Sequence, residues 1–374
     1  MSKNRKSIKG DCKYFLGYKP CKLKKVCSSC AEYAPIEKNI LIIKFAAIGD
    51  VLRTTPLLYG LKRKYPNARI TWISQADACL ILKNNFLIDK VLNYSLDNVL
   101  WLLSQEFDIL INLDKDLRAA SLANLIIAKR KLGFSLNRFG NISVFNSSAE
   151  YIFRLGVDDE LKFRKNKLSY QQMNALACEI DFKNDKYILG LPKNIISKAD
   201  RFWKSKGVCD SDILIGLNTG AGKVFATKVW PQEYYITLAR KLSGFKNIKI
   251  ALFGGPLEVK RNKEIARRLR DKIIDTGCDN TILDFAAILK RCDLLVTSDT
   301  LGMHLAISHD IPVVVLFGPT STQEVEIYGK GVKLSSDERC SPCYKNECSF
   351  LKCMKNIAPE TVLKTIVKIL GLKK

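Results

Sequence analysis

The feature that most constrains the fold of this chain is an alternation between short apolar runs and longer helical patterns. Runs rich in Ile, Leu and Val occur at residues 40–45, 69–74, 90–94 and 107–113, and again at 213–217, 248–253, 273–276, 293–297 and 312–317. Buried parallel strands read as nearly continuous apolar runs, and strands that alternate with helices form βαβ units. The pattern therefore predicts an α/β fold with parallel sheets.

The alternation occurs in two series. Residues 138–186 hold irregular sequence apart from an amphipathic stretch at 170–180, and the strand pattern resumes at 213. A chain of 374 residues also exceeds what one hydrophobic core usually organises. We therefore predict an N-terminal Rossmann-like domain at 39–185 and a C-terminal one at 186–374, which ends in a helix.

The composition is that of a folded soluble protein with a strong positive charge. Hydrophobic residues make up 47% and charged residues 26%, and the net charge is +24 from 61 Lys and Arg against 37 Asp and Glu. This excess favours anionic partners, such as phosphorylated sugars, nucleic acid or an acidic membrane face, although lysines spread over solvated faces would give the same total. No run approaches the roughly 18 uncharged apolar residues of a membrane span, and the start lacks the apolar core of a signal peptide. We expect a cytoplasmic protein, with the inner membrane surface as a candidate partner.

Eight of the 13 cysteines form two groups of four. The groups are Cys12, Cys21, Cys27 and Cys30, and Cys340, Cys343, Cys348 and Cys353. The first lies in a basic extension at 1–38, where four thiolates are candidates for a zinc ion or an iron–sulfur cluster, and two disulfides are the alternative. For the second group, in the segment 340–353, a structural metal is preferred over plain reduced thiols.

Polar or glycine-bearing turns follow several predicted strands of the second half. They lie at residues 218–223, 254–256, 298–304 and 318–320. In an open α/β sheet such turns share one edge, and their backbone N–H groups, with Lys223 or Lys228, suit a diphosphate. Neither G-x-x-x-x-G-K-[ST] nor G-x-G-x-x-G occurs, which disfavours a P-loop kinase and a dinucleotide enzyme.

Asp50 follows the first predicted strand and precedes a helix predicted at 51–65. A carboxylate at a helix N-terminus commonly accepts backbone N–H bonds, so this segment alone favours an ordinary N-cap.

Several of these motifs together resemble glycosyltransferase family 9, the ADP-heptose:lipopolysaccharide heptosyltransferases. The motifs are ILIIKFAAIGDVLRTTP at 40–56, NTGA at 218–221, KVWP at 228–231, FGG at 253–255, SDTLGMHLA at 298–306 and FGPT at 317–320. They occur in order, and the resemblance runs from about residue 39 to the C-terminus.

The resemblance implies a GT-B architecture, in which two Rossmann-like domains face each other across a cleft. The N-terminal half would hold a lipid-linked, anionic lipopolysaccharide core acceptor at the inner membrane face, and the C-terminal half would hold ADP-heptose. It further implies an inverting, metal-independent transfer that requires no cofactor, with Asp50 as the general base and no nucleic acid as a partner. We expect partial desolvation to raise the basicity of this carboxylate.

The resemblance also assigns donor-binding residues. It implies a phosphate-binding turn at Thr219 and Gly220, and a phosphate contact from Lys228. It also implies that Asp299 holds donor-sugar hydroxyls. The adjoining helix would start with Thr300, Leu301, Gly302 and His304. Whether Lys223 or Lys228 reaches the phosphate stays open.

Two alternatives are a family member that uses another nucleotide sugar or glycan acceptor, and a non-catalytic binding protein stapled by metal. The joint presence of Asp50, Lys228 and Asp299 argues against the second.

Overall fold

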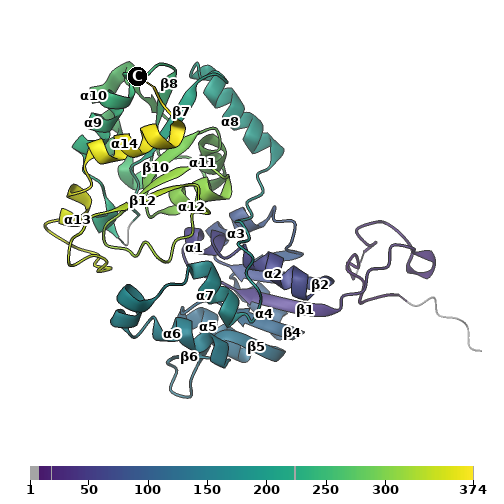
Figure 1. The fold of residues 1–374 in the computed structure, drawn as a ribbon. Coiled ribbons are helices and arrows are strands. Elements are labelled where there is room, and N and C mark those ends of the chain that lie inside the picture. Colours follow the sequence, from purple (N-terminus) through teal and green to yellow (C-terminus); the bar gives the residue numbers. More distant parts are fainter. Residues whose placement is uncertain (1–7, 18, 223–224, 374) are drawn as a thin grey trace, which may run out of the picture.

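A computed structural model describes residues 8–17, 19–222 and 225–373 of the chain. It has two Rossmann-like domains, each built on a six-stranded sheet, and the two sheets lie in different halves of the sequence (Figure 1). The predicted α/β fold with parallel sheets is confirmed. The exact domain boundaries stay predictions.

The first sheet has the strand order β3-β2-β1-β4-β5-β6, and every neighbouring pair is parallel except β5 and β6. Its strands are β1 Lys38–Ile43, β2 Ala68–Ser74, β3 Lys90–Asn93, β4 Glu106–Asn112, β5 Ile127–Leu136 and β6 Ile142–Val144. The helices of this half are α1 Ile48–Leu52, α2 Leu57–Lys64, α3 Ala76–Leu82, α4 Leu96–Leu103, α5 Leu117–Leu125, α6 Glu150–Arg154 and α7 Tyr170–Ala177. Buried side chains of α4 and α5 share one apolar cluster with the sheet, whereas those of α2 and α3 belong to the cluster on its other face.

The second sheet is fully parallel, in the order β12-β11-β10-β7-β8-β9. Its strands are β7 Ile213–Asn218, β8 Ile248–Phe253, β9 Ile274–Asp275, β10 Leu294–Ser298, β11 Val313–Phe317 and β12 Gly331–Ser335. The helices are α8 Lys193–Ser205, α9 Gln232–Leu242, α10 Val259–Leu269, α11 Ile282–Leu289, α12 Leu301–Ser308, α13 Lys352–Lys355 and α14 Pro359–Leu370.

Both sheets reverse their strand order at one point, between β1 and β4 in the first and between β7 and β10 in the second. Helices that leave neighbouring strands there turn to opposite faces and open a crevice at the carboxyl ends of the strands, where ligands of open α/β sheets bind. The two crevices face each other in this fold, because α1 of the first half contacts α12 of the second (Figure 1).

The helix predicted at 51–65 is interrupted. The chain forms α1 and α2 with a turn between them, because Pro56 cannot donate a backbone hydrogen bond and becomes the N-cap of α2. Strands β5, β6 and β12 were not predicted. In β5 the reason is the run Lys129, Arg130 and Lys131, which interrupts the apolar signal of a strand; the first two are exposed and the third is partly buried.

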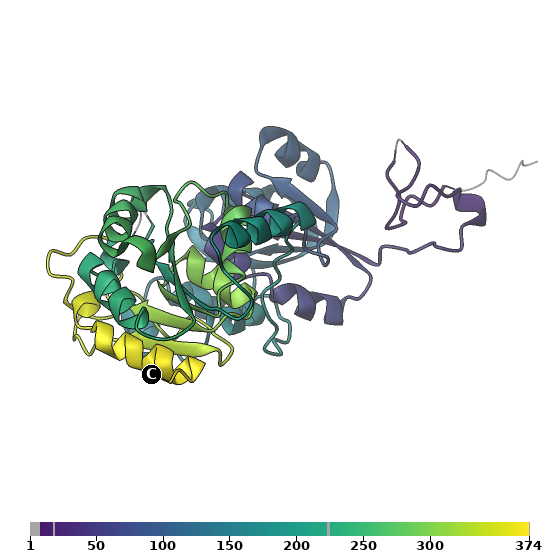
Figure 2. The same ribbon diagram turned by 90° about the horizontal axis from the view of Figure 1, so that it is seen from above.

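Residues 8–37 project away from the two sheets (Figures 1 and 2). Their described part holds a short 3₁₀ helix at Cys27–Ser29 and one bridge between Cys12 and Pro35, and it has no buried residue. None of the helices in the part of the chain that the structure describes is long and apolar enough to cross a membrane.

Candidate active site

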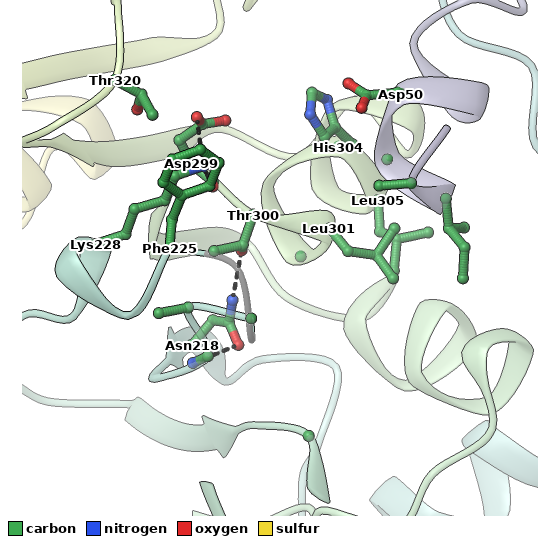
Figure 3. A pocket seen from close by; sticks show the side chains of 18 of the residues that line it. Asp50, Asn218, Phe225, Lys228, Asp299, Thr300, Leu301, His304, Leu305 and Thr320 are labelled. Carbon is green, nitrogen blue, oxygen red and sulfur yellow. Dashed lines mark hydrogen bonds and ion pairs between the residues drawn. The ribbon is translucent and has the colours of Figure 1, made fainter. Parts of the chain in front are cut away.

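A cavity of about 780 Å³ opens where the carboxyl ends of the two sheets meet. Its N-terminal wall comes from the turn after β1 and from α1, which carries Asp50 and Arg53. Its C-terminal wall comes from the turns after β7, β8 and β10 and from the segments around residues 320–325 and 344. The cavity therefore lies at the point where each sheet reverses its strand order. Figure 3 shows Asp50 on one side of it and Lys228 with Asp299 on the other.

Asp50 lies in the first turn of α1 and forms an ion pair with Arg53, at 2.7 Å between Oδ1 and Nη2. The N-cap of this helix is Ala47, so the N-cap interpretation of Asp50 is wrong. Arg53 is held in turn against the ring of Tyr170, with its guanidinium carbon 3.7 Å from the ring centroid. About a third of the Asp50 side chain is exposed, at 34%, which leaves the carboxylate accessible from the cavity.

The charge state of Asp50 differs from our expectation. Burial by itself raises the pKa of the carboxyl, but the positive charges of Arg53 and Lys44 outweigh burial, and the pKa lies below its ordinary value of 3.8. The expected gain in basicity from desolvation is therefore wrong. The structure instead keeps the carboxylate ionised at neutral pH.

Lys228 and Asp299 form an ion pair on the opposite wall. The Lys228 ammonium lies 3.0 Å from Oδ2 of Asp299 and donates to the backbone carbonyl of the same residue, also at 3.0 Å. Burial raises the pKa of Asp299, but Lys228, His304 and Arg53 together outweigh burial, and the pKa lies below the ordinary value. Both side chains line the cavity, so the structure brings together the cation and the carboxylate that the sequence singled out.

His304 lies on α12 between these two groups (Figure 3). The imidazole is buried, and its Nδ1 lies 3.3 Å from the Tyr187 hydroxyl. Burial and the nearby charge of Arg53 lower the pKa of His304 to about 4, so the ring is neutral at pH 7. The two walls touch here, because a Cβ placed on Gly49 would come within 2.7 Å of Cδ2 of His304.

The other predicted donor residues divide into two groups. Gly220, Thr300, Leu301 and Gly302 line the cavity. Thr219 does not: its buried hydroxyl donates to Oδ1 of Asn262 at 2.6 Å and so faces the protein interior. Lys223 lies outside the described residues, and of the two lysines only Lys228 can be placed in the wall.

Several cavity residues were not singled out from the sequence. Among them are Arg53, Phe225, Glu324 and Tyr344. The place of Arg53 could have been predicted, because a cation three residues after a helical carboxylate lies on the same helix face. The place of Tyr344 could not, since this residue reaches the cavity from within the C-terminal cysteine segment through an irregular loop.

The cysteine groups do not form ready metal sites. Among the described residues, no group of three or more His, Cys, Asp or Glu is arranged to hold a metal ion. The first four cysteines do border one small cavity of about 20 Å³. In the second group, burial raises the pKa of Cys353, and the neighbouring cysteines 340, 343 and 348 raise it further. Metal binding by either group stays a prediction.

Comparison with known proteins agrees with this geometry. Residues 100–354 match the family model described as glycosyltransferase family 9 (heptosyltransferase). The chain is 26% identical over 335 residues to lipooligosaccharide heptosyltransferase 2 of Campylobacter jejuni, which covers 86% of this chain and 95% of the relative. It is 23% identical over 332 residues to lipopolysaccharide heptosyltransferase 1 of Pseudomonas aeruginosa, which covers 83% of this chain and 88% of the relative.

A solved structure supports the same fold. The family 9 glycosyl transferase of Veillonella parvula superposes with a TM-score of 0.73 at 23% identity, covering 90% of this chain and 98% of that one. The sequence and family-model matches show that this protein is a glycosyltransferase. It belongs to glycosyltransferase family 9, the heptosyltransferase family, as the sequence motifs predicted.

Proposed function

We propose that this enzyme transfers a heptose from ADP-heptose to a hydroxyl of the lipopolysaccharide core, by a single inverting displacement that needs no metal ion. The observation that carries the proposal is the shared cavity, in which an ionised Asp50 faces an anion-binding wall that holds Lys228. The relatives named as lipopolysaccharide heptosyltransferases supply the sugar and the acceptor class.

In the proposed step, the acceptor hydroxyl oxygen forms a bond to the anomeric carbon while the bond from that carbon to the β-phosphate oxygen breaks. Asp50 takes the hydroxyl proton, and the bonding electrons leave with ADP. The base must be ionised before attack, and the Arg53 ion pair ensures this. Because attack and departure occur on opposite faces, the anomeric configuration inverts.

The leaving diphosphate needs positive charge and hydrogen-bond donors on the C-terminal wall. Lys228 supplies the charge, and the backbone of the turn at Gly220 and of the start of α12 supplies N–H groups. In the free chain the Lys228 ammonium is bound to Asp299. We infer that the diphosphate binds the Lys228 ammonium in place of Asp299. The Asp299 carboxylate can then accept hydrogen bonds from the sugar hydroxyls.

The positive net charge of +24 suits an anionic acceptor presented at a membrane surface. We infer that the protein works at the cytoplasmic face of the inner membrane as a peripheral protein.

The test is to incubate the protein with truncated lipopolysaccharide and a panel of ADP-, UDP- and GDP-sugars, and to follow nucleotide release and product mass. We expect release of ADP from ADP-heptose together with a heptose-sized mass increase of the acceptor, and a product of inverted anomeric configuration. Transfer that occurs only with a UDP- or GDP-sugar, or with retained configuration, would contradict the proposal.

A further inference from the structure

Lys115 and Lys162 do not line the cavity, but each lies near a residue that does, Glu324 and Tyr344 respectively. Neither lysine has an ion-pair partner among the described residues. The Lys115 ammonium makes one hydrogen bond, to the backbone carbonyl of Ile152 at 3.3 Å. The Lys162 ammonium lies 4.0 Å from the ring centroid of Tyr344. An ammonium group has three donors, so both retain unused hydrogen-bonding capacity.

Lys115 is tied to the loop that carries the proposed base. It follows β4, which pairs with β1, and Oδ2 of Asp114 accepts a hydrogen bond from the backbone N–H of Phe45 at 2.8 Å. The Lys44 ammonium donates to the backbone carbonyl of Leu113 at 2.6 Å. The turn after β4 and the segment leading to Asp50 are therefore held together by direct hydrogen bonds.

Lys162 approaches the cavity from the connection between α6 and α7, which Figure 1 shows below the segment that precedes α13. The neighbouring Phe163 stacks on Tyr344 with ring centroids 5.2 Å apart, and Tyr344 lines the same cavity as Asp50. This connection also adjoins Lys115, because a Cβ placed on Gly156 would collide with Nζ of Lys115.

The two ammonium groups are close enough to affect each other. Burial lowers the pKa of Lys115 to about 8, and the charge of Lys162 lowers it further, while Glu324 opposes this effect. Glu324 is the nearby carboxylate, yet it forms no ion pair with either lysine in the described part of the chain. A bound anion would therefore relieve the repulsion between the two lysines.

We propose that Lys115 and Lys162 form an anion subsite, which holds a carboxylate or phosphate group of the acceptor while an acceptor hydroxyl lies at Asp50. This inference rests on the proposed transfer reaction and names how its acceptor is recognised. The diphosphate of the donor has its own cation, Lys228, on the opposite wall. The enzyme would then bind two separate anionic groups, one on each substrate.

The test compares steady-state kinetics of the wild type with Lys115→Gln, Lys162→Gln and the double variant, using ADP-heptose and truncated lipopolysaccharide. Exposed charge pairs contribute modestly, so we expect the acceptor KM to rise about two- to fivefold for each single variant and about tenfold for the double variant. The donor KM and kcat should stay within about twofold. Lys115→Arg and Lys162→Arg should retain the wild-type acceptor KM, and Lys204→Gln, at an exposed lysine on α8, is the matched control.

An acceptor KM that is unchanged in the double variant would overturn the subsite, and so would a donor KM that rises by the same factor. Acceptors with phosphates removed, or with carboxylates reduced, identify the anion, because its removal should abolish the difference between the wild type and the double variant. A difference that survives both removals would also overturn the proposal.

Binding of truncated lipopolysaccharide without donor separates this inference from the proposed function. If the wild type binds it but transfers no sugar, and the double variant binds it about tenfold more weakly, the reaction is wrong and the subsite stands. If transfer occurs and both proteins bind equally, the reaction stands and the subsite is wrong.

Discussion

The two walls of the cavity present different chemical groups. The N-terminal wall presents charged side chains, the Asp50 and Arg53 pair, at the carboxyl end of its sheet. The C-terminal wall is larger and combines glycine-bearing turns and several apolar side chains with the ion pair between Lys228 and Asp299. Side chains can move protons, whereas backbone N–H groups at strand ends and helix starts bind anions. This difference supports our proposal that the N-terminal wall performs proton transfer and the C-terminal wall holds the nucleotide sugar.

Replacing Asp50 should have the largest effect. Asp50→Asn keeps the shape of the side chain but removes the proton acceptor, so we expect kcat to fall about 10²- to 10⁴-fold. Calorimetric titration with ADP should give a dissociation constant within about twofold of the wild type, because we place the nucleotide on the opposite wall. A kcat that stays near the wild-type value would remove Asp50 from the chemistry.

Replacing Lys228 tests the opposite wall. Lys228→Ala removes the cation that we place at the leaving diphosphate, and we expect kcat/KM for the donor to fall about 10²- to 10³-fold. The same variant should also weaken ADP binding, unlike Asp50→Asn. Equal ADP affinity in the wild type and Lys228→Ala would mean that the diphosphate binds elsewhere.

Gly49 tests the contact between the walls. In Gly49→Ala the new Cβ would lie 2.7 Å from Cδ2 of His304, so either the imidazole or the two helices must shift. We expect a loss of about 1–3 kcal/mol in the free energy of unfolding, measured by chemical denaturation, with a lower kcat. The control is Gly244→Ala, where the nearest atom would be 3.5 Å away. Similar losses in both variants would show that the walls do not depend on this contact.

The smallest expected effect is a shift in pH dependence. Arg53 favours the ionised form of Asp50, so the acidic limb of kcat/KM in the wild type should lie below the ordinary carboxyl pKa of 3.8. Arg53 is the largest of the influences that lower the pKa of Asp50, so removing its charge should raise that pKa. A pH profile of Arg53→Gln should therefore show its acidic limb at higher pH than the wild type, while Arg53→Lys should stay closer to the wild type. An unshifted limb in Arg53→Gln would break the proposed coupling.

The sequence predicted the architecture well, because buried parallel strands carry a strong apolar signal. It failed at β5, where three consecutive charged residues interrupt the apolar pattern, and in the region after Asp50, where Pro56 divides the helix. In the site, Asp50, Lys228, Asp299 and His304 were found through motifs, and the structure places all four at one cavity.

Other features of the site depend on distant residues and could not be read locally. Thr219 belongs to the same motif as Gly220, but its hydroxyl donates a hydrogen bond to Asn262, 43 residues away. The pKa of Asp50 depends on how closely Arg53 and Lys44 approach it, which a one-dimensional pattern does not contain. Tyr344 reaches the cavity only because an irregular loop folds back over the second sheet.

The most direct test of the account is a crystal structure of the protein with ADP bound. We expect the diphosphate to lie within hydrogen-bond distance of the Lys228 ammonium and the start of α12, with the Asp50 carboxylate facing the open end of the β-phosphate, where the sugar would be. A diphosphate bound away from Lys228, or an Asp50 side chain turned out of the cavity, would contradict the division of work between the two walls.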